Sequence, residues 1–456
     1  MKRTDGTHGA AGSNAPAAVP SHVEDAGSSP ESTWSLTGDA ETLLADPRGF
    51  REAAAQVTAI LVRHHGPQQL DRIEDAVQDA FAAAARSWPV AGAPRDAIAW
   101  LTRVAHRRYL DQVRAERRLA DDPAALDSAI SAPDTAQSAQ LDPAPLADDQ
   151  LRLLFLCCHP ALSAESRVAL TLKCVAQFSV PEIARLLRAE PTAVAQRLVR
   201  AKRALQETRA TFVVPEPSAL ADRLNDVHAV CYAIFAEGHL ATDGELLVRP
   251  ELCVEAMHLV QQLLQWPVTD TPAGRALLAL MLLTAARLPA RYAEGAPVSL
   301  AEQDRRLWNR KLITRGMRYF VSSAAGTAMT RYHLEAEIAA AHANAVTYQE
   351  TPWPSIVSAY DRLLQIASSP MVHLARAMAI AESGDRTAAL NAVQLLPTSV
   401  QQWPEWHATM ATLLLREGHA AQAAMHWEQA IERTASVAVR EYYGKQLRVA
   451  RERVSG

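Results

Sequence analysis

The segment Phe178–Gln206 constrains the fold of this chain more than any other part of the sequence. Ser179 and Glu182 form an S-x-x-E capping box, which predicts a helix beginning at Val180 or at the proline after it. A second proline, Pro191, predicts a break followed by a new helix, because proline is tolerated in the first helical turn and not in the interior. Two short helices joined by a tight turn indicate a helix-turn-helix.

The second of these helices is rich in cations. Its apolar positions recur at helical spacing, and polar or basic side chains fill the remaining positions: Gln196, Arg197, Arg200, Lys202 and Arg203. A basic helix with a polar N-terminal end is typical of a helix that enters the DNA major groove. The alternative is a helical hairpin whose charged face is only solvated.

The composition favours an all-α chain. Of the 456 residues, 49% are hydrophobic but only 5% are aromatic, which suits packing of Ala- and Leu-rich helices. We find no apolar run of the roughly 18 residues needed to cross a bilayer, and no apolar core of a signal peptide. These features predict a cytoplasmic protein with no membrane contact.

Charge is strongly patterned along the chain. Residues 51–118 contain 11 Arg and 8 acidic residues, and residues 151–210 contain 10 basic and 4 acidic residues. Between them, residues 119–150 contain 7 Asp and neither Lys nor Arg. Two basic modules separated by an acidic tether indicate two nucleic-acid contacts on one chain.

Periodicity divides the chain further. Residues 1–45 have few large apolar groups and are expected to be disordered, and residues 119–147 lack periodicity and are expected to form a flexible acidic linker. The helical segments between and after them are residues 46–118, 148–212 and 213–456. We also expect a Pro/Gly loop at Ser87–Pro94, before a helix from about Arg95 to Arg118.

A repeat with two copies lies within residues 369–435. Gly384 and Gly418 are 34 residues apart, the period of tetratricopeptide repeats (TPRs), and an Ala/Leu-rich helix flanks each glycine on both sides. This spacing predicts TPR-like helical hairpins. The alternative is an ordinary helical domain with two similar turns.

Two further faces carry candidate chemistry. In the stretch EDAVQDAF, Glu74 and Gln78 are i, i+4 neighbours, and so are Asp75 and Asp79. The helix face that they share would suit binding to a basic partner surface, or it would simply be solvated. The stretch AWLTRVAHRRYLDQVRAERR interleaves arginines with aromatic residues, as proteins that bind single-stranded or melting DNA do, although a solvated helix would look similar.

These motifs, in this order and over about 150 residues, resemble an RNA polymerase sigma factor of the sigma-70 family. The resemblance is to the extracytoplasmic-function group, and to the subgroup that has a C-terminal helical extension. It implies a region 2-like domain at residues 46–118 and a region 4-like domain at residues 148–212. It also implies two partners, core RNA polymerase and promoter DNA.

The resemblance implies roles for individual residues. The polymerase clamp would be bound by Glu74, Asp75, Gln78, Asp79 and Phe81. The upstream −35 element would be contacted by Thr192, Ala193, Gln196, Arg197, Arg200 and Arg203. The downstream −10 element, with a base flipped out of the stack, would be contacted by Trp100, Arg103, Arg107, Arg108, Arg114 and Arg118.

The chain departs from the family pattern at two points. The entry to the helix-turn-helix, often Gly-Leu-Ser or Gly-Phe-Ser, reads Gln177-Phe178-Ser179 here. In the extension, an FNEGY-like segment reads Phe235-Ala236-Glu237-Gly238-His239. The second departure removes the family's Asn and Tyr, and with them any role assigned to those side chains.

Catalytic and metal sites are not predicted. The cysteines (Cys157, Cys158, Cys174, Cys231 and Cys253) form no C-x-x-C pair and fit reduced, buried thiols. Adjacent Cys157 and Cys158 cannot easily ligate one tetrahedral ion together, and no phosphate-binding glycine loop occurs. We therefore expect neither enzyme activity nor a cofactor.

The leading hypothesis is a promoter-recognition factor with a fused regulatory domain, whose helical hairpins would offer a surface for a protein or peptide partner. A stand-alone helix-turn-helix regulator with a TPR-like sensor or scaffold domain is the alternative. It leaves the EDAVQDAF face and the first arginine-rich helix without a role. A TPR-type scaffold with incidental basic helices is a third hypothesis.

Overall fold

The computed structural model describes residues 47–119, 146–187, 189–239, 249–293, 296–326 and 328–455. The expected disordered segment 1–45 and almost all of the expected linker 119–147 lie outside these residues. The prediction of an all-α fold is confirmed. In the described part of the chain the strands are two-residue segments, β1 (Tyr292–Ala293) and β2 (Ala296–Pro297), which pair antiparallel.

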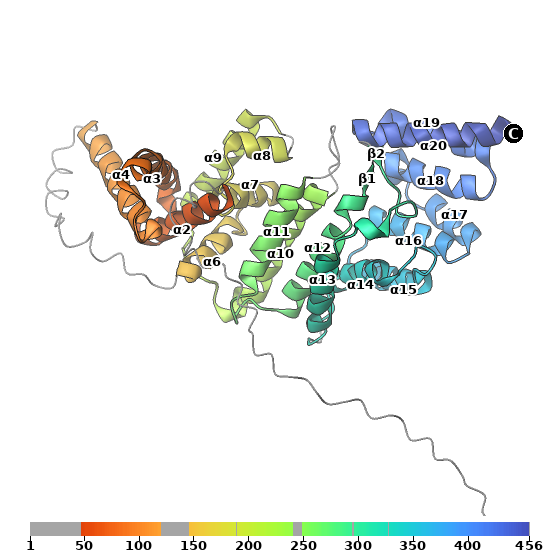
Figure 1. The fold of residues 1–456 in the computed structure, drawn as a ribbon, viewed down its shortest axis with the longest axis horizontal. Coiled ribbons are helices and arrows are strands. Elements are labelled where there is room, and N and C mark those ends of the chain that lie inside the picture. Colours follow the sequence, from red (N-terminus) through yellow and green to blue (C-terminus); the bar gives the residue numbers. More distant parts are fainter. Residues whose placement is uncertain are drawn as a thin grey trace, which may run out of the picture.

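The first helices form a module at one end of the molecule (Figure 1). They are α2 (Pro47–His65), the short 3-10 helix η1 (Pro67–Gln69), α3 (Leu70–Ala91) and α4 (Ala97–Leu119). Leu61, Ile73, Phe81 and Leu101 are buried between them. Apolar residues at helical spacing therefore face inward, and Arg103, Arg107, Arg108 and Arg114 of α4 lie on the outside of this module.

The expected loop at Ser87–Pro94 is wrong over its first half, because α3 continues to Ala91 and includes Pro89. Proline at this position removes the backbone bond to Ala85 O and its ring crowds that carbonyl, a cost that tertiary packing must offset. The indole of Trp88, 2% exposed, packs edge-on against Trp100 with ring centroids 5.4 Å apart, which holds this turn in place. Gly92 then ends the helix with φ +81°.

The second module contains the helix-turn-helix. Its helices are α6 (Leu146–Cys157), α7 (Ala164–Cys174), α8 (Val180–Leu187) and α9 (Pro191–Glu207). The predicted capping box is present, since the Ser179 backbone N–H donates to Glu182 Oε2 over 2.8 Å and Glu182 N–H donates to Ser179 Oγ over 3.4 Å. The predicted break and the restart at Pro191 are also confirmed.

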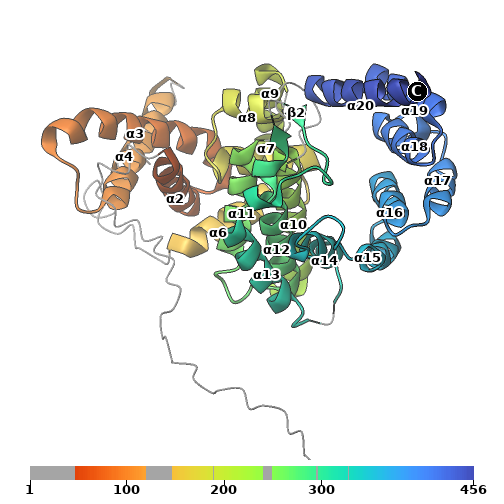
Figure 2. The ribbon, with the colours of Figure 1, turned by 45° about the vertical axis from the view of Figure 1, so that its right-hand side comes forward.

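The remaining residues form a long helical extension. Its first part contains α10 (Pro217–His239), α11 (Pro250–Leu263), α12 (Pro272–Ala285), η2 (Leu288–Ala290), η3 (Arg305–Leu307), α13 (Arg310–Ser323), α14 (Arg331–Asn344) and α15 (Trp353–Ile366). Its second part contains α16 (Pro370–Glu382), α17 (Arg386–Gln394), η4 (Val400–Gln402), α18 (Pro404–Arg416), α19 (Ala420–Arg433) and α20 (Val437–Ser455). Figure 2 shows α14 to α20 following a curved path.

The two glycines of the predicted repeat occupy equivalent turns. Gly384 lies between α16 and α17 with φ +109°, and Gly418 lies between α18 and α19 with φ +87°. Both helix pairs pack as hairpins. The 34-residue spacing therefore marks left-handed turns that glycine adopts without strain.

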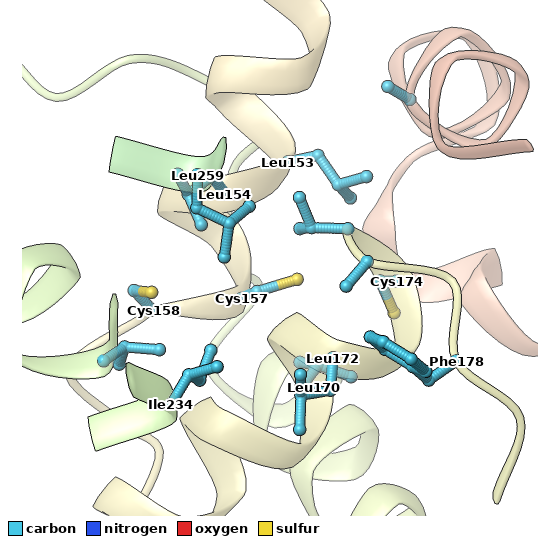
Figure 3. Close-up of a cluster of buried hydrophobic side chains, with 14 of the residues drawn as sticks. Leu153, Leu154, Cys157, Cys158, Leu170, Leu172, Cys174, Phe178, Ile234 and Leu259 are labelled. Atoms are coloured by element: carbon cyan, nitrogen blue, oxygen red, sulfur yellow. The ribbon is translucent and has the colours of Figure 1, made fainter. Parts of the chain in front are cut away.

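The two modules and the start of the extension share one hydrophobic core. A continuous buried cluster runs from Ala53 on α2 through the helix-turn-helix module to α12, and it also includes Tyr332 on α14. Figure 3 shows part of it, where Leu154 of α6 and Cys158, just after that helix, face Leu259 of α11 and Ile234 of α10. The second part of the extension has its own cluster, from Leu374 to Ala450.

One helical segment is longer and more apolar than expected, because the sequence analysis above predicts no run long enough to cross a bilayer. Pro272–Ala290 is 19 residues long with a mean hydropathy of 1.3, so it is long and apolar enough to span a bilayer by those two measures. However, 67% of it is buried inside the protein, where α12 packs against α11, α13 and α14. This is the environment of a core helix, which is apolar all round because neighbouring helices surround it.

Candidate promoter and polymerase interface

Helix α9 presents the predicted upstream-element residues to solvent. Val194, Leu198 and Leu205 are buried, and these apolar positions anchor the helix on α7 and α8. The opposite face carries Thr192, Ala193, Gln196, Arg200 and Arg203, which are exposed, and Arg197, which is half-buried. The first turns of α9 are therefore free to approach a groove, as a recognition helix requires.

Helix α4 presents a second cationic surface. Arg103, Arg107, Arg108 and Arg114 are exposed, whereas Trp100 is half-buried against Trp88. Arg114 lies 3.7 Å from Asp111, a distance at which an exposed pair contributes little. The backbone of Arg118 belongs to α4, but its side chain lies outside the described residues.

The predicted polymerase-binding residues of α3 divide into three environments. Asp75, Gln78 and Asp79 are exposed. Phe81 is only 4% exposed and packs on Phe50 with ring centroids 4.3 Å apart, so the structure places it in the core and not on a partner-facing surface. The i, i+4 pattern could not separate these positions, because Phe81 also follows the apolar stripe of α3.

Glu74 is engaged inside the chain. Its side chain is 12% exposed, and its Oε2 lies 3.1 Å from Lys202 Nζ of α9 and 3.9 Å from Lys173 Nζ of α7. The thiol of Cys174 donates to Glu74 Oε1 over 3.3 Å. Lys202 also lies 2.6 Å from Asp71 Oδ1. The acidic helix of the first module is thus bonded to the helix-turn-helix module.

The role of Lys202 differs from the sequence prediction. The sequence pattern places Lys202 among the cations of the recognition helix, but in the structure the residue is 8% exposed and faces α3. Burial disfavours its charge, but the nearby Glu74 and Asp71 carboxylates outweigh burial and raise the pKa of Lys202. The sequence did contain a signal for this burial. Lys202 lies four residues after the buried Leu198 and directly after the buried Ala201, next to the apolar stripe of α9.

Gln177 makes a second contact between the modules. It has φ +56°, a left-handed conformation in which glycine is the usual residue. Its side-chain amide donates to Cys174 O over 2.6 Å and to Thr58 Oγ1 of α2 over 3.3 Å. The departure from the family's Gly-Phe-Ser entry therefore adds a hydrogen bond between modules that glycine could not make.

The cysteines are buried, and within the described part of the chain no group of three His, Cys, Asp or Glu side chains is placed to hold a metal ion. Burial raises the pKa of Cys158 to about 12 and that of Cys157 well above its ordinary value. These thiols stay protonated near neutral pH, which makes them poor nucleophiles and poor metal ligands.

The two parts of the extension face each other across a half-open cavity of about 620 Å³. Aromatic side chains line much of it: Tyr348, Trp353, Tyr360, Trp427 and Tyr442. Arg416 of α18 and Glu382 of α16, also in the lining, form an ion pair of 2.6 Å. This size and mixture of groups is typical of a site for a small molecule or an extended peptide.

Comparisons with known proteins match these parts of the chain. Sigma-70 region 2 matches residues 50–119, sigma-70 region 4 matches residues 152–205, and a family of unknown function (DUF6596) matches residues 223–324. No solved structure matches the chain.

The chain belongs to the sigma-70 family of transcription initiation factors, which direct core RNA polymerase to promoters. An uncharacterized protein of Rhizobium meliloti (strain 1021) is 35% identical over 398 residues, which cover 87% of this chain and 93% of that protein. This similarity includes most of the extension as well as both sigma-70 regions.

Proposed function

We propose that this chain is an extracytoplasmic-function type sigma factor that contacts two elements of a promoter and contains its own regulatory domain. Helix α9 would contact the upstream −35 element through Thr192, Gln196, Arg197 and Arg200. Helix α4 would contact the −10 element and help to melt it. The observation that carries the proposal is the exposure of both cationic helices, one in each region that matches the sigma-70 family.

Charge supports this assignment. The exposed arginines of α4 and α9 can neutralise phosphates, and Trp100 offers part of an aromatic face beside them. The exposed acids Asp75 and Asp79 would bind a basic surface of core polymerase. Such a factor acts in the bacterial cytoplasm, where core polymerase and the chromosome are found.

We further propose that the extension is a TPR-like regulatory domain with a protein or peptide partner. Two consecutive hairpins with glycine turns 34 residues apart support the TPR-like assignment. The aromatic-lined cavity supports the proposal that this domain binds a protein or peptide partner.

Run-off transcription with core RNA polymerase on genomic fragments tests the proposal. The full-length chain should produce discrete transcripts, and the start sites should share one pair of promoter elements. Arg200→Ala should reduce these transcripts, whereas Arg451→Ala, an exposed change on α20, is the matched control and should not.

A stand-alone helix-turn-helix regulator would bind DNA through α9 without a stable complex with core polymerase. Pull-down of purified core enzyme separates the two functions. Stable capture supports the sigma factor, and DNA binding without capture supports the regulator.

A further inference from the structure

Helix α13 of the extension has a strongly cationic face outside both sigma-70 regions. The sequence from Arg305 to Leu334 contains seven basic residues and no acidic residue. Four of these cations belong to α13 and are exposed: Arg310, Lys311, Arg315 and Arg318. Helix α9, the proposed recognition helix, has four cations and one acidic residue, so α13 is at least as basic.

The charge of this face is not neutralised inside the protein. Among the described residues, none of the four cations has an ion-pair partner. By contrast, Arg331, Arg362 and Arg376 of the following helices each pair with a carboxylate. The side-chain amide of Gln261 on α11 can accept hydrogen bonds from Arg315, but a neutral acceptor leaves the positive charge in place. The face is therefore available to an external anion.

Local electrostatics disfavours these cations. Arg310 and Lys311 lie in the first turn of α13, where the helix dipole opposes positive charge, and that turn has no acidic residue. Lys311 and Arg315 are like charges at i, i+4, a spacing at which they destabilise a helix. Helix stability does not account for the pattern, whereas binding to an anionic partner would.

Helix α13 is held firmly against the core. Its buried positions include Ile313 and Gly316, and a Cβ atom at Gly316 would lie 2.8 Å from Leu283 Cγ of α12, so the two helices approach closely there. The side chain of Asn309 caps the helix by accepting from the Leu312 backbone N–H over 3.2 Å. The cations therefore extend from a fixed helix and not from a loop.

The geometry of the face fits the backbone of duplex DNA. Arg310 and Arg318 are about 12 Å apart along the helix axis at 1.5 Å per residue, which spans about three to four base pairs at 3.4 Å each. The aromatic residues of α13, Tyr319 and Phe320, are half-buried and pack on the core of the extension. The exposed face thus offers cations for phosphates but lacks the stacking surface that binds single strands.

We propose that the exposed face of α13 binds the phosphate backbone of duplex DNA without reading its sequence, as a third DNA contact in addition to α4 and α9. Figures 1 and 2 both show α13 at the edge of the molecule opposite to α8 and α9, so this surface is separate from the recognition helix. The contact raises the affinity of the chain for any duplex. It thereby keeps the protein on DNA during the search for promoters.

The salt dependence of DNA binding tests the proposal. Arg310→Gln, Lys311→Gln and Arg318→Gln together make the α13 triple variant of the full-length chain. Its affinity for a fluorescent duplex without a promoter is measured by anisotropy at several salt concentrations, in the absence of polymerase. Each lost phosphate contact lowers the slope of log affinity against log salt by about 0.9, so the slope should fall by about 2 to 3. Affinity near physiological salt should fall by about tenfold or more.

A matched control removes the same charge from another helix. Lys445→Gln, Arg448→Gln and Arg451→Gln together remove three exposed cations of α20, so the two triple variants have the same net charge. The α20 triple variant should keep the wild-type slope. Arg318→Gln alone should lower the slope by about 0.9, and Arg318→Lys should not, because lysine also neutralises a phosphate. Thermal unfolding of the α13 triple variant should occur at or above the wild-type temperature, because like-charge repulsion is relieved.

The contrary outcomes are distinct. An unchanged slope in the α13 triple variant and in Arg318→Gln would overturn the proposal. Equal decreases in the two triple variants would also overturn it, since general charge and not this face would then attract DNA. Weaker capture of core polymerase with an unchanged DNA slope would assign the face to a protein partner instead. Because the duplex contains no promoter and polymerase is absent, the result is independent of the proposed sigma-factor function.

Discussion

Replacing Phe81 by alanine distinguishes a core residue from a polymerase-binding residue. The family resemblance places Phe81 on the polymerase-facing helix, but the structure buries its ring to 4% exposure against Phe50. A Phe→Ala change in a core costs about 3–5 kcal/mol, because transfer energy is lost and a cavity remains. That is about two to three and a half powers of ten in the unfolding equilibrium.

Chemical denaturation followed by circular dichroism measures this effect. The modules and the start of the extension share one core, so we expect Phe81→Ala to shift the transition of that whole unit. Gln78→Ala, an exposed change one turn earlier on α3, is the matched control and should leave stability within about 0.5 kcal/mol. The reasoning is refuted if Phe81→Ala is as stable as wild type and loses only polymerase affinity.

Further predictions concern the DNA surface, a repeat turn and a buried histidine. Arg200→Ala should weaken promoter binding and lower the slope of log affinity against log salt by about 1, as a filter-binding titration would show; an unchanged slope excludes a phosphate contact. Gly418→Ala should cost about 1–2 kcal/mol in thermal unfolding because of its φ of +87°, whereas Gly444→Ala inside α20 should not destabilise; equal effects would contradict the turn assignment. Burial lowers the pKa of His228 to about 4, whereas the unfolded chain protonates it near 6.5. Stability should therefore decline as pH falls from 6.5 to 4, by up to about 3 kcal/mol, and His228→Leu should flatten that decline in pH-dependent denaturation.

Local features of the fold could be predicted because they depend on neighbouring residues. The capping box at Ser179, the break before Pro191 and the glycine turns 34 residues apart each follow from backbone chemistry within a few positions. The continuation of α3 through Pro89 was not predicted, since it depends on the packing of Trp88 against Trp100 from the next helix.

The candidate site was predictable in its exposed parts and not in its buried ones. Arginine-rich faces can be recognised from spacing, and α4 and α9 do expose them. Whether Glu74 faces solvent or Lys202 depends on how residues 128 positions apart meet, which periodicity within one helix cannot encode. The shared core between the helix-turn-helix module and α10 to α12 was missed for the same reason.

The central claim is that this chain directs core RNA polymerase to promoters, and run-off transcription with purified components tests it most directly. Full-length protein plus core enzyme should yield transcripts from specific genomic fragments, and core enzyme alone should yield none. Binding of the chain to those fragments without any transcript, under conditions where core enzyme is active with another sigma factor, would contradict the account.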